Sequence, residues 1–195
     1  AFVQFADFMP LALNQIISEL STMSWRTLGK FNCPMVIVAS SGAYRPGLGP
    51  FHGQTMDGYL CHTPGIEVVF PSNAADAAGL MISAIESPNP TVYLYPKSLL
   101  NDPVSASPLG EEIQGVPIGK GRIAREGADV TFVGWGNTVP FLMQAAETLE
   151  TAGASAEVID LRSLAPWDRE LVAASVKKTG RLLVSHEDNE TAGLG

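Results

Sequence analysis

The chain has 195 residues, of which 46% are hydrophobic, and its formal net charge at pH 7 is −8. A chain of this size can bury a core and form one domain or two small ones, at roughly 100–200 residues per domain. The acidic balance and the scattered basic residues argue against nucleic acid or an anionic membrane as a partner. Cys33 and Cys61 lack CxxC spacing and a flanking histidine pair, which argues against a disulfide framework and a zinc site.

We expect no targeting signal within this sequence. The first residues lack a basic segment followed by an apolar run, and no apolar segment approaches the roughly 20 residues that span a bilayer. The chain starts without Met and stops at Gly195, inside a glycine-rich turn. We therefore expect both termini to be truncated, and we expect a cytoplasmic or organelle-matrix protein that is not secreted.

The first hundred residues read as an α/β unit. Apolar residues at spacings of three and four predict an amphipathic helix from Met9 to Met23, and the β-branched run from Pro34 to Ala39 predicts a buried strand of a parallel sheet. Ser41 to Gly53 is a breaker-rich loop, of a length that is often functional. The later elements are a short helix over 55–61, a strand over 66–70, a helix over 73–86 opened by a Ser72/Asn73 cap, and a strand over 91–95.

A proline-rich stretch separates this unit from a second one. Residues 96–117 show little periodicity and read as a linker. Beyond it, Glu126 to Asp129 predict the turn of a hairpin between strands at 118–125 and 130–135. Helices over 140–151 and 168–179 and strands over 156–161 and 181–185 follow. The expected organisation is α/β throughout, with domains at 1–100 and 118–195 and a linker at 101–117.

His52 is the leading candidate for a catalytic residue. It follows the flexible Ser41–Gly53 loop and precedes a short helix, where α/β sheets usually present ligand-binding groups. A surface or capping histidine is the competing interpretation, because the sequence shows no partner base or metal co-ligand. His62 fits the end of a helix, where it would satisfy the last carbonyls.

Other polar and aromatic residues have ordinary explanations. The turn from Gly134 to Asn137 lacks the glycine spacing of a phosphate-binding loop and reads as a common strand-to-helix turn. The phenylalanines at 2, 5 and 8 are expected to pack in the core, although an aromatic at a helix start can also form the wall of a heteroaromatic site. We expect a further set of carboxylates to cap helices: Asp160, Asp168, Glu187 and Asp188.

A set of short motifs, in order along the chain, resembles the beta subunit of thiamine-dependent branched-chain 2-oxo-acid and pyruvate dehydrogenases. In the first unit these are Gln4-Phe5-Ala6-Asp7-Phe8, Asn14-Gln15-Ile16, Phe31-Asn32-Cys33, His52-Gly53-Gln54, His62-Thr63-Pro64-Gly65-Ile66-Glu67-Val68-Val69 and Pro88-Asn89-Pro90. In the second they are Pro117-Ile118-Gly119-Lys120-Gly121, Val158-Ile159-Asp160-Leu161-Arg162-Ser163-Leu164 and His186-Glu187-Asp188. The resemblance implies a partial pyrimidine-type thiamine-diphosphate-binding domain followed by a transketolase C-terminal-like domain.

The resemblance also implies a shared cofactor site. Thiamine diphosphate would lie between subunits, with its diphosphate and Mg²⁺ held by an alpha subunit. Phe8 matches the aromatic residue that stacks on the aminopyrimidine ring, and Gln54 matches a hydrogen-bonding neighbour of the histidine. His52 matches the histidine that transfers protons while the acyl group passes to the lipoyl carrier. Some members hold a structural K⁺ through backbone carbonyls near positions matching Met35, Val36 and Asn89.

The sequence departs from the family's pattern in three places. Gly53 replaces the usual serine between the histidine and the glutamine. Val38 stands where the family usually has an arginine, so a charged fork is missing. The glutamate that activates the cofactor would fall upstream of Ala1.

The resemblance implies oxidative decarboxylation of a branched-chain 2-oxo acid or pyruvate, carried out in a heterotetramer with an alpha subunit and a second beta subunit. The acyl group would pass to a lipoyl domain attached to the acyltransferase core of the complex. Two alternatives stay open. One is an enzyme of the 1-deoxyxylulose-5-phosphate synthase or transketolase type, and the other is a non-catalytic assembly module of the same fold.

Overall fold

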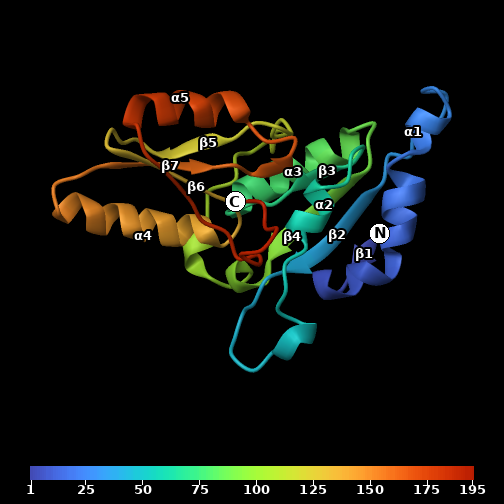
Figure 1. Ribbon diagram of the computed structural model, residues 1–195, viewed down its shortest axis with the longest axis horizontal. Coiled ribbons are helices and arrows are strands. Elements are labelled where there is room, and N and C mark those ends of the chain that lie inside the picture. Colours follow the sequence, from blue (N-terminus) through green and yellow to red (C-terminus); the bar gives the residue numbers. More distant parts are fainter.

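The computed structural model describes residues 1–195 as two β-sheets with helices packed around them (Figure 1). The first sheet has the strand order β1-β2-β4-β3-β8 and the second has the order β5-β7-β6-β9. The strands of the first sheet are β1 (Phe2–Val3), β2 (Val36–Ser41), β3 (Glu67–Val69), β4 (Thr91–Pro96) and β8 (Ser163–Ala165). Those of the second are β5 (Arg122–Arg125), β6 (Val130–Gly134), β7 (Ala156–Asp160) and β9 (Leu182–Val184).

The first sheet is parallel except at β8, which confirms the parallel sheet predicted from the apolar run before Ser41. Its strands are apolar on both faces because both faces are covered. On one face the core cluster, which includes Ile37 and Val92, packs against η1 (Ala6–Ala12) and α2 (Asp57–Cys61). On the other face Val69 and Tyr93 pack against Leu80 of α3 (Ala74–Glu86).

The segment before β2 is helical, but the regular helix predicted over 9–23 is wrong. Three successive pieces replace it: the 3₁₀ segment η1, the π-helical segment η2 (Gln15–Leu20) and the single turn α1 (Met23–Arg26). Pro10 lies inside η1 and has no amide hydrogen to donate, which favours an irregular backbone there. Met9 and Ile16 still face the core, as the apolar spacing predicted.

Helix α3 begins where its cap was predicted. The Asn73 side chain accepts a hydrogen bond from the Asp76 amide at 2.9 Å, and the Asn73 amide group donates to the Asp76 carboxylate at 2.6 Å. This reciprocal arrangement satisfies an otherwise free backbone donor and fixes the Asp76 side chain at the start of the helix. Residues after β4 form η4 (Lys97–Leu99) and η5 (Pro103–Ser105) and then run along α3, where the Val116 amide donates to the Gly79 carbonyl at 3.0 Å.

The second sheet is covered on opposite faces by α4 (Thr138–Thr151) and α5 (Arg169–Thr179) (Figure 1). The predicted hairpin between its first two strands is wrong. β5 pairs antiparallel with β7, and β6 pairs parallel with β7 on the other side. The turn residues lie against the start of β7 instead, since the Asp129 amide donates to the Ser155 carbonyl at 3.0 Å. None of the helices in the molecule is both long enough and apolar enough to cross a membrane.

The two sheets are joined by a strand and by a group of ion pairs. Strand β8, which was not predicted, follows the second sheet's β7 in the chain yet pairs with β3 of the first sheet. Beside it, Asp76 accepts hydrogen bonds from Arg162 at 2.8 Å and from Arg122 at 2.9 Å. Burial alone would raise the pKa of Asp76, but hydrogen bonds from Arg162 and Asn73 and the charges of both arginines lower it.

Asp160 completes this junction from the end of β7. Its carboxylate is fully buried and accepts from the Ser72 hydroxyl at 2.5 Å and from Arg122 at 3.2 Å. Burial outweighs the arginine charges and raises the pKa of Asp160 to about 6. Asp160 therefore binds across the junction, and the helix-capping role predicted for it is wrong.

A second buried carboxyl group joins α2 to the second sheet. Asp57, 1% exposed, accepts a hydrogen bond from the indole nitrogen of Trp135 at 2.8 Å. Burial, together with the neighbouring Asp188 carboxyl group, raises the pKa of Asp57 to about 6. The loop before α2 is thereby tied to the end of β6.

Removing Asp76 should weaken the junction strongly. Asp76→Ala leaves Arg122 and Arg162 without their shared carboxylate, and breaking a largely buried pair costs about 3 kcal/mol. Urea denaturation should show this loss in the free energy of unfolding. Glu19→Ala is the matched control, because the Glu19–Arg26 pair is 56% and 41% exposed and should contribute less than about 1 kcal/mol. Equal losses in the two variants would contradict the importance of the junction.

The raised pKa of Asp57 predicts a stability that depends on pH. The folded state favours the protonated form of Asp57, so this carboxyl group makes its full contribution to the free energy of unfolding below about pH 4. The contribution falls as the pH rises toward the folded pKa of about 6, and it is lost above that pH. Asp57→Asn keeps an acceptor for Trp135 and cannot ionise. Its free energy of unfolding, relative to the parent protein, should rise by about 2 kcal/mol between about pH 4 and about pH 7. The exposed Glu86→Gln should show no such trend, and a pH-independent difference for Asp57→Asn would refute the shift.

Candidate functional site

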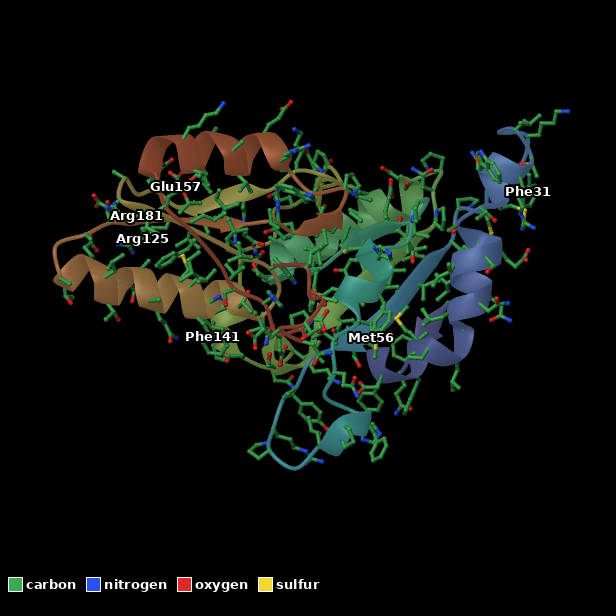
Figure 2. The ribbon with its side chains drawn as sticks, in the orientation of Figure 1. Phe31, Met56, Arg125, Phe141, Glu157 and Arg181 are labelled. Atoms are coloured by element: carbon green, nitrogen blue, oxygen red, sulfur yellow. The ribbon has the colours of Figure 1, made fainter.

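The candidate site lies at the carboxyl edge of the first sheet. β1, β2 and β4 run parallel, so the segments that follow them emerge at the same edge. These segments are residues 4–8, the loop 42–54 and η4. The loop extends away from the body of the molecule (Figure 1), and Met56, which is 7% exposed, lies at its base (Figure 2). This arrangement brings together residues that are distant in the sequence.

Three rings meet at this edge. The His52 imidazole lies 4.5 Å from the Phe5 ring and 5.9 Å from the Phe8 ring, measured between centroids. Phe5 and Phe8 make a perpendicular contact at 5.7 Å. Phe8 is 38% exposed, so one part of its ring contacts its neighbours and the rest faces outward. The predicted residues Phe8 and His52 are thus adjacent, and an aromatic surface is available beside the imidazole.

Gln54, the third predicted residue, lies in the same loop. Its amide group donates to the Pro50 carbonyl at 2.5 Å, and its backbone carbonyl accepts from the Gly42 amide at 3.1 Å. The side chain is exposed and closes the loop on itself. The structure therefore engages the Gln54 amide group within the loop, two residues along the chain from His52.

Three charged residues, none of them predicted to belong to the site, hold this loop. Asp7 accepts from the backbone amides of Gly53 and Gln54 at 3.2 and 3.1 Å. Lys97 donates to the His52 carbonyl at 2.6 Å. Glu187 accepts from the Ala43 amide at 3.0 Å and from the Asn137 side chain at 2.8 Å, which links the start of the loop to the second sheet. Asp7 and Glu187 both belong to motifs quoted for the resemblance, and this membership was the one indication in the sequence that they could have a role in the site.

The positions suggested for a potassium ion lie at the opposite end of β2. The Met35 carbonyl accepts from the Thr91 amide at 2.9 Å, and the Val36 carbonyl accepts from the amino group of Ala1 at 2.6 Å. Asn89 donates from its side chain to Glu67 at 3.0 Å. The three residues are thus neighbours in space, with both carbonyls engaged by protein donors. No group of three or more His, Cys, Asp or Glu side chains is arranged to hold a metal ion.

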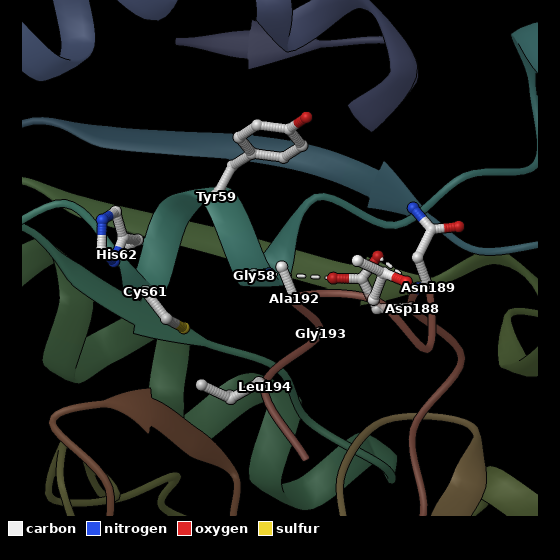
Figure 3. Close-up of a pocket in the computed structure, with 10 residues that line it drawn as sticks. Gly58, Tyr59, Cys61, His62, Asp188, Asn189, Ala192, Gly193 and Leu194 are labelled. Carbon is white, nitrogen blue, oxygen red and sulfur yellow. Dashed lines mark hydrogen bonds between the residues drawn. The ribbon is translucent and has the colours of Figure 1, made fainter.

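A separate cavity of about 450 Å³ opens between α2 and the C-terminal segment (Figure 3). Asp188 crosses it and accepts a hydrogen bond from the Gly58 amide at 3.1 Å. Cys61 lines the cavity, and burial together with the charges of Asp57 and Asp188 raises its pKa to about 12. A thiol with this pKa stays protonated at neutral pH and is a poor nucleophile.

The remaining predictions for the second unit are partly confirmed. Asp168 caps α5 by accepting from the Leu171 amide at 3.2 Å. Asp188 accepts from the Gly58 amide in the first turn of α2, so the capping role predicted for it is confirmed, at a helix distant in the sequence. Glu187 instead binds the loop at 42–54, so the capping role predicted for it is wrong. The turn from Gly134 to Asn137 follows β6 and leads into α4, as predicted for an ordinary turn.

Comparisons with known proteins agree with this arrangement. The chain is 42% identical to 2-oxoisovalerate dehydrogenase subunit beta 2, mitochondrial, of Arabidopsis thaliana, over 100% of this chain and 54% of that protein. It is 36% identical to 2-oxoisovalerate dehydrogenase subunit beta of Bacillus subtilis, over 100% of this chain and 58% of that protein. It is 38% identical to pyruvate dehydrogenase E1 component subunit beta-2, mitochondrial, of Oryza sativa subsp. japonica, over 97% of this chain and 50% of that protein. The chain therefore spans about half the length of the curated relatives it matches.

A solved structure and two family models extend the match. A structure titled split gene transketolase, inactive beta4 tetramer, superposes with a TM-score of 0.79 at 25% identity, over 99% of this chain and 59% of that chain. The model for the transketolase pyrimidine binding domain matches residues 1–103, and the model for the transketolase C-terminal domain matches residues 119–195. The chain belongs to the transketolase family and combines its pyrimidine-binding domain with its C-terminal domain.

Proposed function

We propose that this chain is part of the beta subunit of a 2-oxo-acid dehydrogenase. The observation that carries the proposal is the His52 imidazole beside the Phe5 and Phe8 rings, at 4.5 and 5.9 Å, on the carboxyl edge of the sheet. Identities of 36% and 42% to beta subunits of 2-oxoisovalerate dehydrogenases support the same activity. The reaction would be the oxidative decarboxylation of a branched-chain 2-oxo acid or pyruvate, with transfer of the acyl group to a lipoyl carrier.

The residues at this edge suit the aminopyrimidine ring of thiamine diphosphate. The Phe8 ring is 38% exposed and would stack against a flat heteroaromatic group, with Gln54 at the margin of the site. The Asp7 carboxylate, whose second oxygen is buried without a partner, adds an acceptor nearby. When bound, thiamine diphosphate supplies the carbanion stabilisation that decarboxylation requires.

His52 would act as a general acid in this scheme. Its side chain is half-buried and packs against the rings of Phe5 and Phe8, so the apolar side of the site would hold the imidazole facing the reacting group. An imidazole N–H of His52 would give its proton to the dithiolane sulfur that leaves when the S–S bond of the lipoyl group opens. A positioned acid of this kind contributes about 10²–10⁴-fold to a rate.

The proposed function requires partners. An alpha subunit would hold the diphosphate and Mg²⁺, and a second beta subunit would complete a heterotetramer. The lipoyl domain and acyltransferase core would receive the acyl group, in the cytoplasm or an organelle matrix. Within the chain we propose domains at 1–100 and 118–195 with a linker at 101–117. A K⁺ near Met35, Val36 and Asn89, which the resemblance implies, would have to be a second partner of the Met35 and Val36 carbonyls, because both already accept hydrogen bonds from protein donors.

A transketolase-type enzyme is the second candidate. The TM-score of 0.79 to a split transketolase supports it, whereas the identity of 25% in that match is lower than the 36–42% identity to dehydrogenase beta subunits. Incubation with pyruvate and glyceraldehyde phosphate separates the two. A transketolase-type or synthase-type enzyme joins the substrates, and a dehydrogenase acylates a lipoyl domain instead.

His52→Ala should abolish most of the acyl transfer. In the full-length protein that contains this chain, assembled with its alpha subunit, thiamine diphosphate and Mg²⁺, we expect lipoyl acylation to fall by about 10²–10⁴-fold. Unfolding temperature should change little, because the side chain is only half-buried. Radiolabelled 2-oxo acid and an isolated lipoyl domain provide the measurement.

The matched control is His62→Ala, which removes an exposed imidazole from the end of α2. Acylation should stay within about two-fold of the parent rate in this variant. A His52→Ala enzyme with near-normal acylation would overturn the role of His52. A parent complex that turns over no 2-oxo acid would overturn the proposed activity itself.

A further inference from the structure

Lys97 is a buried cation beside the ring cluster, and neither the motifs nor the proposed chemistry uses it. It is the first residue after β4 and is 9% exposed. Its ammonium group donates to the His52 carbonyl at 2.6 Å and lies 4.6 Å from the centre of the Phe5 ring. Burying an ammonium group is costly unless it is paired and hydrogen-bonded, so this position requires an explanation.

Several groups pack around the Lys97 ammonium group. Burial lowers the pKa of Lys97, and the charges of the Asp7 and Glu187 carboxylates oppose this shift without cancelling it. The rings of Phe5 and Tyr44 add cation–π contacts at 4.6 and 5.8 Å. Lys97 thus gathers partners from η1, from the loop and from the C-terminal segment.

Lys97 and Asp7 hold the same short stretch of backbone. Lys97 binds the carbonyl of His52, and Asp7 binds the amides of Gly53 and Gln54. Three consecutive residues are therefore fixed through main-chain atoms by two side chains of opposite charge. Hydrogen bonds to charged groups are roughly twice as strong as those between neutral groups, so these contacts favour one conformation of the exposed loop.

Phe5 connects the cation to the imidazole. The ring of Phe5 contacts the Lys97 ammonium group at 4.6 Å and the His52 imidazole at 4.5 Å. Lys97 therefore constrains His52 twice, through its peptide carbonyl and through the ring against which the imidazole packs. A change at Lys97 should be transmitted to the imidazole by both contacts.

We propose that Lys97 is a positioning residue that fixes the His52 imidazole against Phe5 and Phe8. The inference rests on the proposed function for its effect on the rate, but the geometric part can be tested without any activity. Misplacement of a reacting group by about 1 Å costs up to about 100-fold in rate, which sets the size of the expected effect.

The test is a double-mutant cycle on the assembled enzyme. Lys97→Met keeps the length of the side chain and removes the charge and the donor. It should lower kcat for lipoyl acylation by about 10- to 100-fold, with little change in KM for the lipoyl domain. In the His52→Ala background the same change should cost almost nothing, because Lys97 acts through His52. Equal losses in both backgrounds would overturn the proposal.

A crystal structure of each variant provides the readout that does not depend on activity. In Lys97→Met the imidazole should leave its contact with Phe5, whereas in the exposed control Lys177→Met it should keep it. An unchanged imidazole in Lys97→Met would overturn the positioning role. If Lys97→Met does not fold, Lys97→Gln, which is polar but too short to reach the His52 carbonyl, serves the same comparison. A parent complex that turns over no 2-oxo acid, together with a displaced imidazole in the Lys97 variant, would refute the proposed function and leave the positioning role intact.

Discussion

The parallel pairing of β1, β2 and β4 is the constraint on which the candidate site depends. Because these strands run in the same direction, the residues that follow them converge at one edge, although they are about fifty residues apart in the chain. Phe5 and Phe8 follow β1, His52 lies in the loop after β2, and Lys97 follows β4. The apolar strands therefore have two effects, since they form the core and align the polar residues beyond their ends.

The second sheet contributes to the site without supplying any of its rings. Glu187 holds the start of the loop through the Ala43 amide, and Trp135 holds Asp57 just beyond the end of the loop. The ion pairs of Asp76 with Arg122 and Arg162 fix the two sheets relative to each other. The position of His52 is therefore coupled to the packing of the whole chain, because both ends of its loop are attached to the second sheet.

Local sequence patterns predicted a helix or strand correctly where its apolar pattern or its capping residue lies within the segment itself. The cap at Asn73, the apolar run of β2 and the helix capped by Asp168 all depend on neighbours in the sequence, and all three were found. The predicted hairpin failed because β7, which comes later in the chain, inserts between its two strands. Strand β8 and Lys97 were missed for a related reason, since the partners of each are more than forty residues away. In the site the resemblance predicted His52 and Phe8, while the charged residues that hold the loop became evident only from contacts between distant segments.

The same contacts bear on two of the three departures from the family's pattern, Gly53 and Val38. The stretch from His52 to Gln54 is held through backbone atoms, so the side chain at Gly53 takes no part in the attachment. A Cβ atom added there would come no closer than 3.7 Å to its neighbours, so serine and glycine are both compatible with the loop. Val38 packs in the apolar cluster on the α3 face of the sheet, the face opposite η1 and α2. An arginine at this position would have to place its charge in that cluster, so valine satisfies the local packing at the cost of any polar contact that an arginine would make.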